Sequence, residues 1–382
     1  MSLQNDPFLN ISNSIQNPYI EEWQKQNNKI IGFYCTYIPE EFLHAAKLLP
    51  FRIRATGSKD TDLADIYMVR FTCSFVRATL DLALRGGYDF LDSLLICNSC
   101  DHSRRMFELF DLKVFNREDF RKNVSRFYIA MPHVISDEGF EWYKKEIEEL
   151  KEELEKSYNK IISAEDLVNS IKIYNKNREY LREIHELRIR DLPKITGSEA
   201  LQLSIANSSV PKDISNRELE RILKAMKKSE GIKTSAKRIM LVGSEVDDVD
   251  FIKLIEDSGA LIVSDLLCFG QRSFMDDVKI KSGEDPLESV SKRLYYRMSC
   301  PRMMNDHQRR LEFLKKEINK AKIDGVILQR INNCDLHGCE NMLLEHEFKE
   351  LEIPVINIDR EFYQADTTRM QTRIEAFIEM IK

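Results

Sequence analysis

The stretch LDSLLICNSCD, residues 91–101, indicates how this chain folds, because a mainly apolar run ends in a polar loop that carries a cysteine. The stretch VILQRINNCD, residues 326–335, has the same character, so the pattern N-x-C-D occurs twice. Each apolar run is typical of a buried strand, and each loop precedes an amphipathic helix. Ligands of open parallel α/β sheets bind beyond the carboxyl ends of the strands, so Cys100 and Cys334 are expected where ligands bind.

Strand-like and helix-like stretches alternate in two parts of the chain, which predicts mainly parallel sheets covered by helices. Strands are expected at residues 30–35, 51–55, 91–97, 126–130, 238–242, 261–267, 325–331 and 354–358. Helices are expected between them at residues 39–49, 63–84, 249–258, 306–321, 340–349 and 367–381. Between the two parts, Glu, Lys, Leu and Ile recur at helical spacing, as in residues 142–160 and 164–187.

The predicted fold class is therefore α/β, with two doubly wound, flavodoxin- or Rossmann-like parallel-sheet domains and an intervening helical region. The predicted boundaries are residues 1–136 for the N-terminal α/β domain, 137–235 for the helical region and 236–382 for the C-terminal α/β domain. The first domain holds Cys73 and Cys100, and the last holds Cys334.

Composition excludes several classes of function. The formal net charge of −6 argues against a nucleic-acid partner, because phosphate neutralisation needs clustered positive charge. No run approaches the roughly 20 apolar residues of a membrane-spanning helix, and residues 1–17 lack the apolar core of a signal peptide. We expect a cytoplasmic protein without a membrane or nucleic-acid partner, whose eight cysteines are reduced unless they hold metal.

Cys100 and Cys334 are the strongest candidates for chemistry, because each lies in a strand-to-helix loop. A helix N-terminus favours negative charge, so a lowered thiol pKa is expected there. Cys73 falls inside the helix predicted at residues 63–84, on an apolar face where a small cysteine is most often core packing. That face comprises Ile66, Val69, Val76 and Leu80.

Two cysteine pairs leave a structural zinc site open as an alternative. Cys97 and Cys100 form C-x-x-C, and Cys334 and Cys339 form C-x-x-x-x-C. Against zinc, Cys97 closes an apolar strand and is expected to point into the core. The remaining cysteines, each near a predicted strand end and equally suited to pocket lining or packing, are Cys35, Cys268 and Cys300.

Several common cofactor and nucleophile motifs do not occur in the sequence. There is no G-x-x-x-x-G-K-[ST] loop, no G-x-G-x-x-G after a strand, no G-x-S-x-G and no H-E-x-x-H. Neither ATP nor a nicotinamide therefore has an evident site in this chain. Metal held by cysteines is the cofactor that the sequence supports.

The chain resembles the iron–sulfur subunits of the 2-hydroxyacyl-CoA dehydratase and benzoyl-CoA reductase family over most of its length, and its own length suits the shorter subunit type. The matching motifs, in order, are CTYIPEE (35–41), TCSF (72–75) with Arg77, NSCD (98–101), ITGSE (195–199), IEDSGA (255–260) with Asp265 and Cys268, DPLE (285–288), CPRM (300–303) and NCDLH (333–337). So many matches in one order are not expected by chance.

The resemblance implies a [4Fe-4S] cluster held by three cysteines of the subunit. The positions that match those ligands are Cys73, Cys100 and Cys334. The assignment of Cys73 rests on the resemblance, because helical spacing alone favours core packing. Three protein ligands leave one iron corner for water, a sulfur species or substrate, so the fourth ligand is unassigned.

The resemblance also implies the chemistry and the partners. In the family, a separate ATP-hydrolysing iron–sulfur activator delivers an electron, and the CoA thioester is reduced to a ketyl radical anion. A homologous larger cluster subunit completes the enzyme. The stretches QRINNCDLHGCEN (329–341) and DRE (359–361), with Thr372 and Arg373 beyond, favour the benzoyl-CoA reductase branch. The alternatives are a 2-hydroxyacyl-CoA dehydratase subunit, a non-catalytic cluster-binding relative and the zinc protein.

His102 and His337 closely follow the loop cysteines and are candidates to donate a proton or a hydrogen bond, or simply to cap loops or face solvent. Arg104 and Arg105 are candidates for CoA phosphates or a partner protein, although surface helix arginines usually contact neither. The sequence therefore assigns no catalytic residue.

Overall fold

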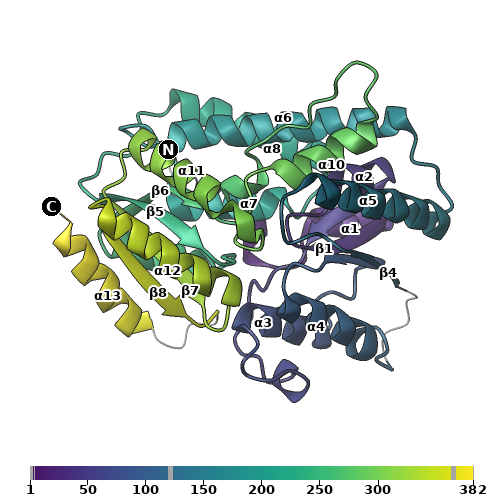
Figure 1. Ribbon diagram of the computed structural model, residues 1–382, viewed down its shortest axis with the longest axis horizontal. Coiled ribbons are helices and arrows are strands. Elements are labelled where there is room, and N and C mark those ends of the chain that lie inside the picture. The colour runs from purple at the N-terminus through teal and green to yellow at the C-terminus, as the bar shows by residue number, and fades with distance from the viewer. Residues whose placement is uncertain (1–2, 4, 119–123, 363–366, 382) are drawn as a thin grey trace.

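Two four-stranded parallel sheets organise the molecule (Figure 1). The computed structural model describes residues 3, 5–118, 124–362 and 367–381. The first sheet has the order β2-β1-β3-β4, and its strands are β1 Lys29–Tyr34, β2 Leu48–Arg52, β3 Ser93–Cys97 and β4 Ser125–Ile129. The second has the order β6-β5-β7-β8, and its strands are β5 Lys237–Gly243, β6 Ala260–Leu266, β7 Gly325–Ile331 and β8 Val355–Arg360. The predicted fold class is confirmed, and both halves share one topology.

Helices cover both sheets, which is why strands β2, β3 and β6 are buried along their whole length. In the first half the helices are α1 Pro18–Lys25, α2 Glu40–Ala45, α3 Ser74–Leu84 and α4 Asp101–Leu109. The middle of the chain forms α5 Asp137–Tyr158, α6 Ala164–Arg188, α7 Gly197–Asn207 and α8 Lys212–Lys228. The second half adds α9 Val249–Asp257, α10 Pro286–Tyr296, α11 His307–Lys320, α12 Asp335–Glu350 and α13 Thr367–Met380. None of the helices in the described ranges combines the length and apolarity needed to cross a bilayer.

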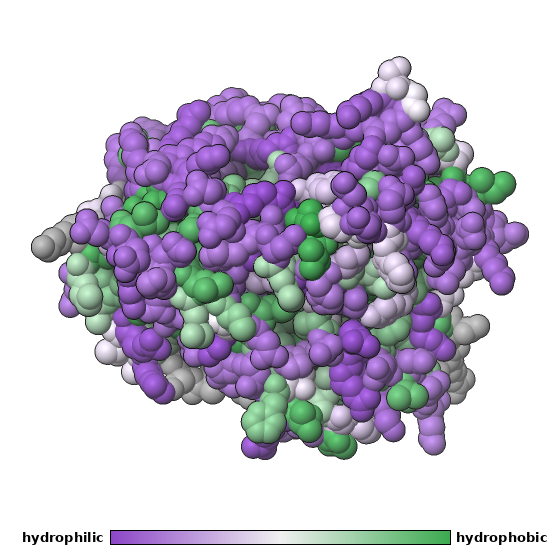
Figure 2. Space-filling model, in the orientation of Figure 1, coloured by the Kyte–Doolittle hydropathy of each residue, from purple (hydrophilic) through white to green (hydrophobic). Residues whose placement is uncertain are grey.

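The helix predicted at residues 63–84 is wrong in its first half. Helix α3 begins only at Ser74, and the segment before it forms a loop with a short 3-10 turn, Ala64–Ile66. Ile66 and Val69 were expected on the packed face, but they are 68% and 69% exposed. Figure 2 shows this apolar surface at the lower edge of the molecule, over the segment that precedes α3. Cys73 is consequently the N-cap of α3 and not a residue of its interior.

Two side chains of α3 hold this loop against the helix instead of letting it extend the helix. The Asp81 carboxylate accepts a hydrogen bond from the Leu63 backbone N–H at 2.8 Å. The Arg77 guanidinium donates to the Thr61 hydroxyl at 2.9 Å and to the Asp65 carboxylate at 2.7 Å. Periodicity alone does not detect such contacts between a loop and the flank of its own helix.

Two other helix boundaries also differ from the prediction. The helix expected at 39–49 ends at Ala45, because Lys47 turns the chain with a left-handed φ of 60°, and β2 starts at Leu48. The helix expected at 340–349 begins five residues earlier, at Asp335. Its first turn closes through the Gly338 N–H, which donates to the Cys334 carbonyl at 2.8 Å.

The sequence did not predict α10, whose Tyr295 packs on α5.

Helix α6 joins the two α/β halves through two buried ion pairs. Arg178 lies 2.7 Å from Glu41 at the start of α2, on the first sheet's side. Arg188, ten residues later, lies 2.6 Å from Asp265 at the end of β6 in the second sheet. All four side chains are at most 8% exposed. The helical region is therefore a bridge that fixes how the two sheets sit relative to each other.

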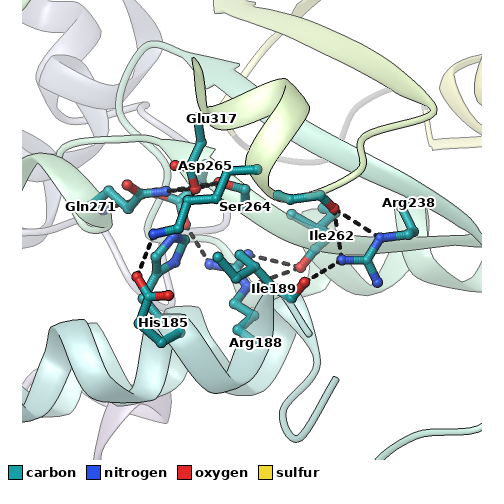
Figure 3. Close-up of polar contacts among 12 residues, drawn as sticks. His185, Arg188, Ile189, Arg238, Ile262, Ser264, Asp265, Gln271 and Glu317 are labelled. Atoms are coloured by element: carbon teal, nitrogen blue, oxygen red, sulfur yellow. Dashed lines mark hydrogen bonds and ion pairs between the residues drawn. The ribbon is translucent and has the colours of Figure 1, made fainter. Parts of the chain in front are cut away.

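A buried polar network surrounds the second of these pairs (Figure 3). The Glu317 carboxylate of α11 lies 2.8 Å from the His185 ring of α6 and accepts a 2.8 Å hydrogen bond from Ser264 of β6. Although burial raises the pKa of Glu317, hydrogen bonds from His185, Ser264 and Gln271 hold it at about 2. Because each member has a partner, the network joins three elements without leaving an isolated charge.

Replacing Arg188 with Met should lower the free energy of unfolding by about 3–5 kcal/mol, because Asp265 is then a buried charge without its partner. Chemical denaturation measures this loss. The matched control is Lys176→Met on the same helix, whose ion pair with Glu179 is half exposed and is worth less than about 1 kcal/mol. Equal effects of the two substitutions would contradict the bridging role of α6.

Candidate functional site

Three cysteines from distant parts of the chain line one cleft. Cys73, Cys100 and Cys334 all contribute to its wall, and its free volume is about 250 Å³. Each is the N-cap of a helix: Cys73 of α3, Cys100 of α4 and Cys334 of α12. The structure thus brings together the three residues that the resemblance singled out.

Sheet topology explains the positions of two of these thiols. In both halves the strand order reverses between the first and third strands, and ligands of such folds bind at this switch point. Cys100 follows the third strand of the first sheet, and Cys334 follows the equivalent strand β7 of the second. The two N-x-C-D loops therefore occupy the same place in their domains.

Contacts between the two halves hold the Cys334 loop beside the segment that carries Cys73. The Asn333 side chain donates to the Arg70 carbonyl at 3.3 Å, which links the Cys334 loop to the loop before Cys73. The Phe362 N–H donates to the Ser74 hydroxyl at 2.7 Å, next to Cys73. These bonds cross from the second half to the first, so the cleft depends on the relative position of the two domains.

Burial dominates the electrostatics of the three thiols. It raises the pKa of Cys73 well above the usual thiol value, and the neighbouring thiols of Cys334 and Cys100 raise it further. Burial also raises the pKa of Cys334 to about 12. At Cys100 burial again raises the pKa, although hydrogen bonds from Ser103 oppose it. The lowered thiol pKa expected from the helix N-termini is thus wrong for the metal-free protein, because burial outweighs the helix dipole.

Polar side chains complete the cleft. The His102 ring accepts a hydrogen bond from the Cys73 backbone N–H at 3.3 Å, so it helps to orient the loop at Cys73. His133 and Arg104 also line the cleft, and Arg104 lies 3.2 Å from Asp101. The sequence did not single out His133, since it follows a strand without any recognisable motif.

His337 does not face solvent, contrary to one of the expectations for it. It is 7% exposed, its Nδ1 atom has no partner among the described residues, and burial lowers its pKa well below the usual value. It is absent from the residues that line the cleft. Arg105, on the outer face of α4, lies 2.7 Å from Glu108 and is 55% exposed.

The other cysteines do not join the cleft. Cys97 is fully buried in the core, as predicted, and its hydrogen bond with Cys35 lowers the pKa of Cys35 to about 6. Cys339 is exposed. The C-x-x-C and C-x-x-x-x-C pairs therefore do not present both of their thiols to one site. The cysteines near strand ends that lie outside the cleft lining are Cys35, Cys268 and Cys300.

The donor set suits a cluster better than a single ion. Within the described ranges, no three His, Cys, Asp or Glu side chains approach closely enough to hold one metal ion. A four-iron cluster is larger and spreads its cysteine ligands around a cube, whereas zinc draws its ligands to one centre. Three thiols around an open cleft, with backbone N–H groups of three helix starts beside them, fit the larger group.

Metal-free protein at pH 7.5 should react with iodoacetamide faster at Cys339 than at the three cleft thiols, because Cys339 is exposed. Cys73, Cys100 and Cys334 should react more slowly, because their raised pKa keeps the thiolate fraction low. Peptide mass spectrometry over time measures each rate. Cys339→Ser should leave the labelling rates of the three cleft thiols unchanged, and labelling of Cys73 at the rate of Cys339 would contradict the burial described above.

Comparison with known proteins places the chain in a family. The family model described as 2-hydroxyglutaryl-CoA dehydratase, D-component, matches residues 35–381. A benzoyl-CoA reductase subunit of Thauera aromatica is 27% identical, over 92% of this chain and 90% of its own. The (R)-phenyllactyl-CoA dehydratase beta subunit of Clostridium sporogenes is 24% identical, over 98% of this chain and 99% of its own. The (R)-2-hydroxyglutaryl-CoA dehydratase beta subunit of Acidaminococcus fermentans is 23% identical, over 95% of each chain.

Proposed function

The chain belongs to the 2-hydroxyglutaryl-CoA dehydratase D-component family, and on that premise we propose that it is the iron–sulfur subunit of an ATP-driven enzyme that reduces CoA thioesters. The observation that carries the proposal is the cleft in which Cys73, Cys100 and Cys334 meet. We propose that these three residues hold a [4Fe-4S] cluster. The relatives are reductase and dehydratase subunits, so the prediction of an enzyme subunit is confirmed.

When bound, such a cluster supplies electrons one at a time at low potential, which suits ketyl-type reduction of a thioester carbonyl. The chain's own residues prepare the site. The starts of α3, α4 and α12 direct N–H groups and the positive ends of helix dipoles at the cleft, which favours a group of negative charge. Burial of Cys73 excludes water from one side, while Cys100 and Cys334 remain partly exposed on the other.

The benzoyl-CoA reductase branch is our preferred assignment, on the sequence around Cys334. The two stretches that favour this branch, residues 329–341 and 359–361, also contact each other. Arg330 lies 2.6 Å from Asp359, and this ion pair joins β7 to β8 beside the Cys334 loop. Relatives from both branches match at similar identity, 27% and 24%. A dehydratase subunit is therefore the second candidate, with the same cleft and cluster.

We also propose two protein partners, a homologous larger cluster subunit and a separate ATP-hydrolysing iron–sulfur activator. The relatives are named as subunits, which supports a multi-subunit enzyme. The loop before Cys73 exposes Ile66, Val69 and Phe71 by 68%, 69% and 80%. Clustered apolar exposure of this kind is typical of a protein–protein contact, and here it lies next to the cleft.

Anaerobically purified protein should contain about four irons and four sulfides per chain, by the stoichiometry of the proposed cluster. Substitution of Cys73, Cys100 or Cys334 by Ser should remove most of the iron, because each thiol is a ligand. Iron and acid-labile sulfide assays and the visible absorption of the cluster measure the loss.

Cys339→Ser is the matched control and should keep the full iron content, because Cys339 is exposed outside the cleft. Full cluster occupancy in the three cleft variants would refute the ligand assignment. Zinc in place of iron would support the structural zinc protein, and a cluster without any thioester turnover would support a non-catalytic relative.

The branch can be tested with the chain, its partner subunit and an activator reconstituted together with ATP and a strong reductant. Our assignment predicts that benzoyl-CoA is converted to a cyclic diene thioester, whereas (R)-2-hydroxyacyl-CoA substrates are not dehydrated. Mass spectrometry of the CoA products separates the two reactions. Dehydration without ring reduction would replace the preferred branch by the second candidate.

A further inference from the structure

A second cavity lies away from the thiol cleft, where both α/β halves meet the helical region. Its walls come from the ends of β1 and β2, from the start of α2, from α6, α7 and α8, and from α10. We call it the cationic cavity, because five of its lining side chains are cations and two are carboxylates. The cations are Arg52, Arg178, Lys212, Arg293 and Arg297.

Three of these cations have carboxylate partners. Arg52 lies 2.6 Å from Glu245, and Arg178 lies 2.7 Å from Glu41. Lys212 is 3.9 Å from its nearest carboxylate, that of Glu40 in the cavity wall. The lysine has a shorter contact with a neutral group, the Asn207 carbonyl, at 3.0 Å.

Within the described part of the chain, the other two cations bond to neutral oxygens, and the Arg297 guanidinium also lies 4.5 Å from the centre of the Tyr37 ring. Arg293 donates to the carbonyls of Asp276 and Ser273, at 2.9 and 3.1 Å. Arg297 donates to the Arg272 carbonyl at 2.8 Å and to the Thr36 hydroxyl. Burial, and after it the nearby guanidinium of Arg178, lower the pKa of Arg293 to about 9, although the Glu41 carboxylate opposes this shift.

Three buried polar atoms in this wall have no hydrogen-bond partner among the described residues. They are the Tyr174 hydroxyl, the Arg178 Nε and the Arg297 Nε. The Arg178 Nε lies 3.6 Å from the Asp277 carboxylate, which is beyond hydrogen-bond distance. All three side chains are 4% exposed, so bulk water does not satisfy them. A guanidinium carries donors only, so whatever completes the site must accept hydrogen bonds.

A small anion both accepts hydrogen bonds and offsets positive charge, whereas water does only the first. Water can accept the unmatched hydrogen bonds, but it does not offset the charge of Arg297, which is buried and forms no ion pair with a carboxylate among the described residues. The cavity has a free volume of about 40 Å³. By the 10–15 Å³ that one ordered water needs, this is room for about three waters or for one compact oxyanion.

We propose that the cationic cavity binds a small oxyanion of phosphate size, which joins the helical region to both α/β halves. Arg178 and Tyr174 would meet it from α6, Arg297 from the end of α10, and Lys212 from the start of α8. Arginine and lysine are the usual partners of such oxyanions, because their hydrogen bonds to anions are charge-assisted. The site is distinct from the thiol cleft, with which it shares no lining residue.

Inorganic phosphate is the probe for this site, titrated into the full-length, metal-free protein by calorimetry and thermal unfolding. Ionic strength is held constant with sodium chloride. We expect saturable binding and a rise in Tm that chloride at equal ionic strength does not produce. Absence of saturable phosphate binding overturns the proposal. The readout involves neither iron nor turnover, so it is independent of the proposed function.

Tyr174→Phe is the decisive variant, because it removes only a hydroxyl without a protein partner. It should leave the Tm without phosphate unchanged and weaken phosphate binding about tenfold or more, the loss of one hydrogen bond to a charged group. Tyr180→Phe, on the same helix but outside the cavity, should bind phosphate as the parent does. Equal affinity of the two variants overturns the proposal.

A crystal grown with selenate in place of phosphate gives an independent readout. An anomalous selenium peak within hydrogen-bond distance of Tyr174 and Arg297 supports the site. Ordered waters alone in the cavity, with selenate at the surface or nowhere, overturn it.

Discussion

Helix α6 sets the relative position of the two sheets, and the other features of the molecule follow from that placement. Its two buried ion pairs, Arg178 with Glu41 and Arg188 with Asp265, lie on opposite halves of the molecule. Ten helical residues separate the two arginines, a span of about 15 Å. A rigid helix between two buried pairs acts as a spacer, because neither end can move without leaving a buried charge unpaired.

The thiol cleft is a consequence of this spacing. Cys73 and Cys100 belong to the first half, whereas Cys334 comes from the second and is held beside them by the contacts of Phe362 with Ser74 and of Asn333 with Arg70. In the metal-free protein, burial keeps these three thiols protonated. A bound iron cluster would shift them to the deprotonated form, because it stabilises thiolates. Domain placement and metal binding are therefore coupled in the function that we propose.

The cationic cavity lies where the same helical region meets both α/β halves. Arg178 belongs both to the spacer and to the cavity wall, so one residue supports the domain junction and lines the cavity. Guanidinium groups repel each other and carry no acceptor, and the buried Nε atoms of Arg178 and Arg297 have no hydrogen-bond acceptor among the described residues. An anion in the cavity would supply that acceptor where all three parts of the chain meet.

Hydrophobic periodicity was enough to predict the two parallel sheets, the helical region and the strand-end positions of Cys100 and Cys334, because it reports local burial directly. It misplaced Cys73, because the spacing of Ile66 and Val69 is that of a helix. In the structure, contacts of Asp81 and Arg77 hold the segment before α3 as a loop. Without the family resemblance, Cys73 would have counted as core packing. That three thiols share a cleft and five cations share a cavity became visible only in three dimensions, because both depend on contacts between residues more than a hundred positions apart.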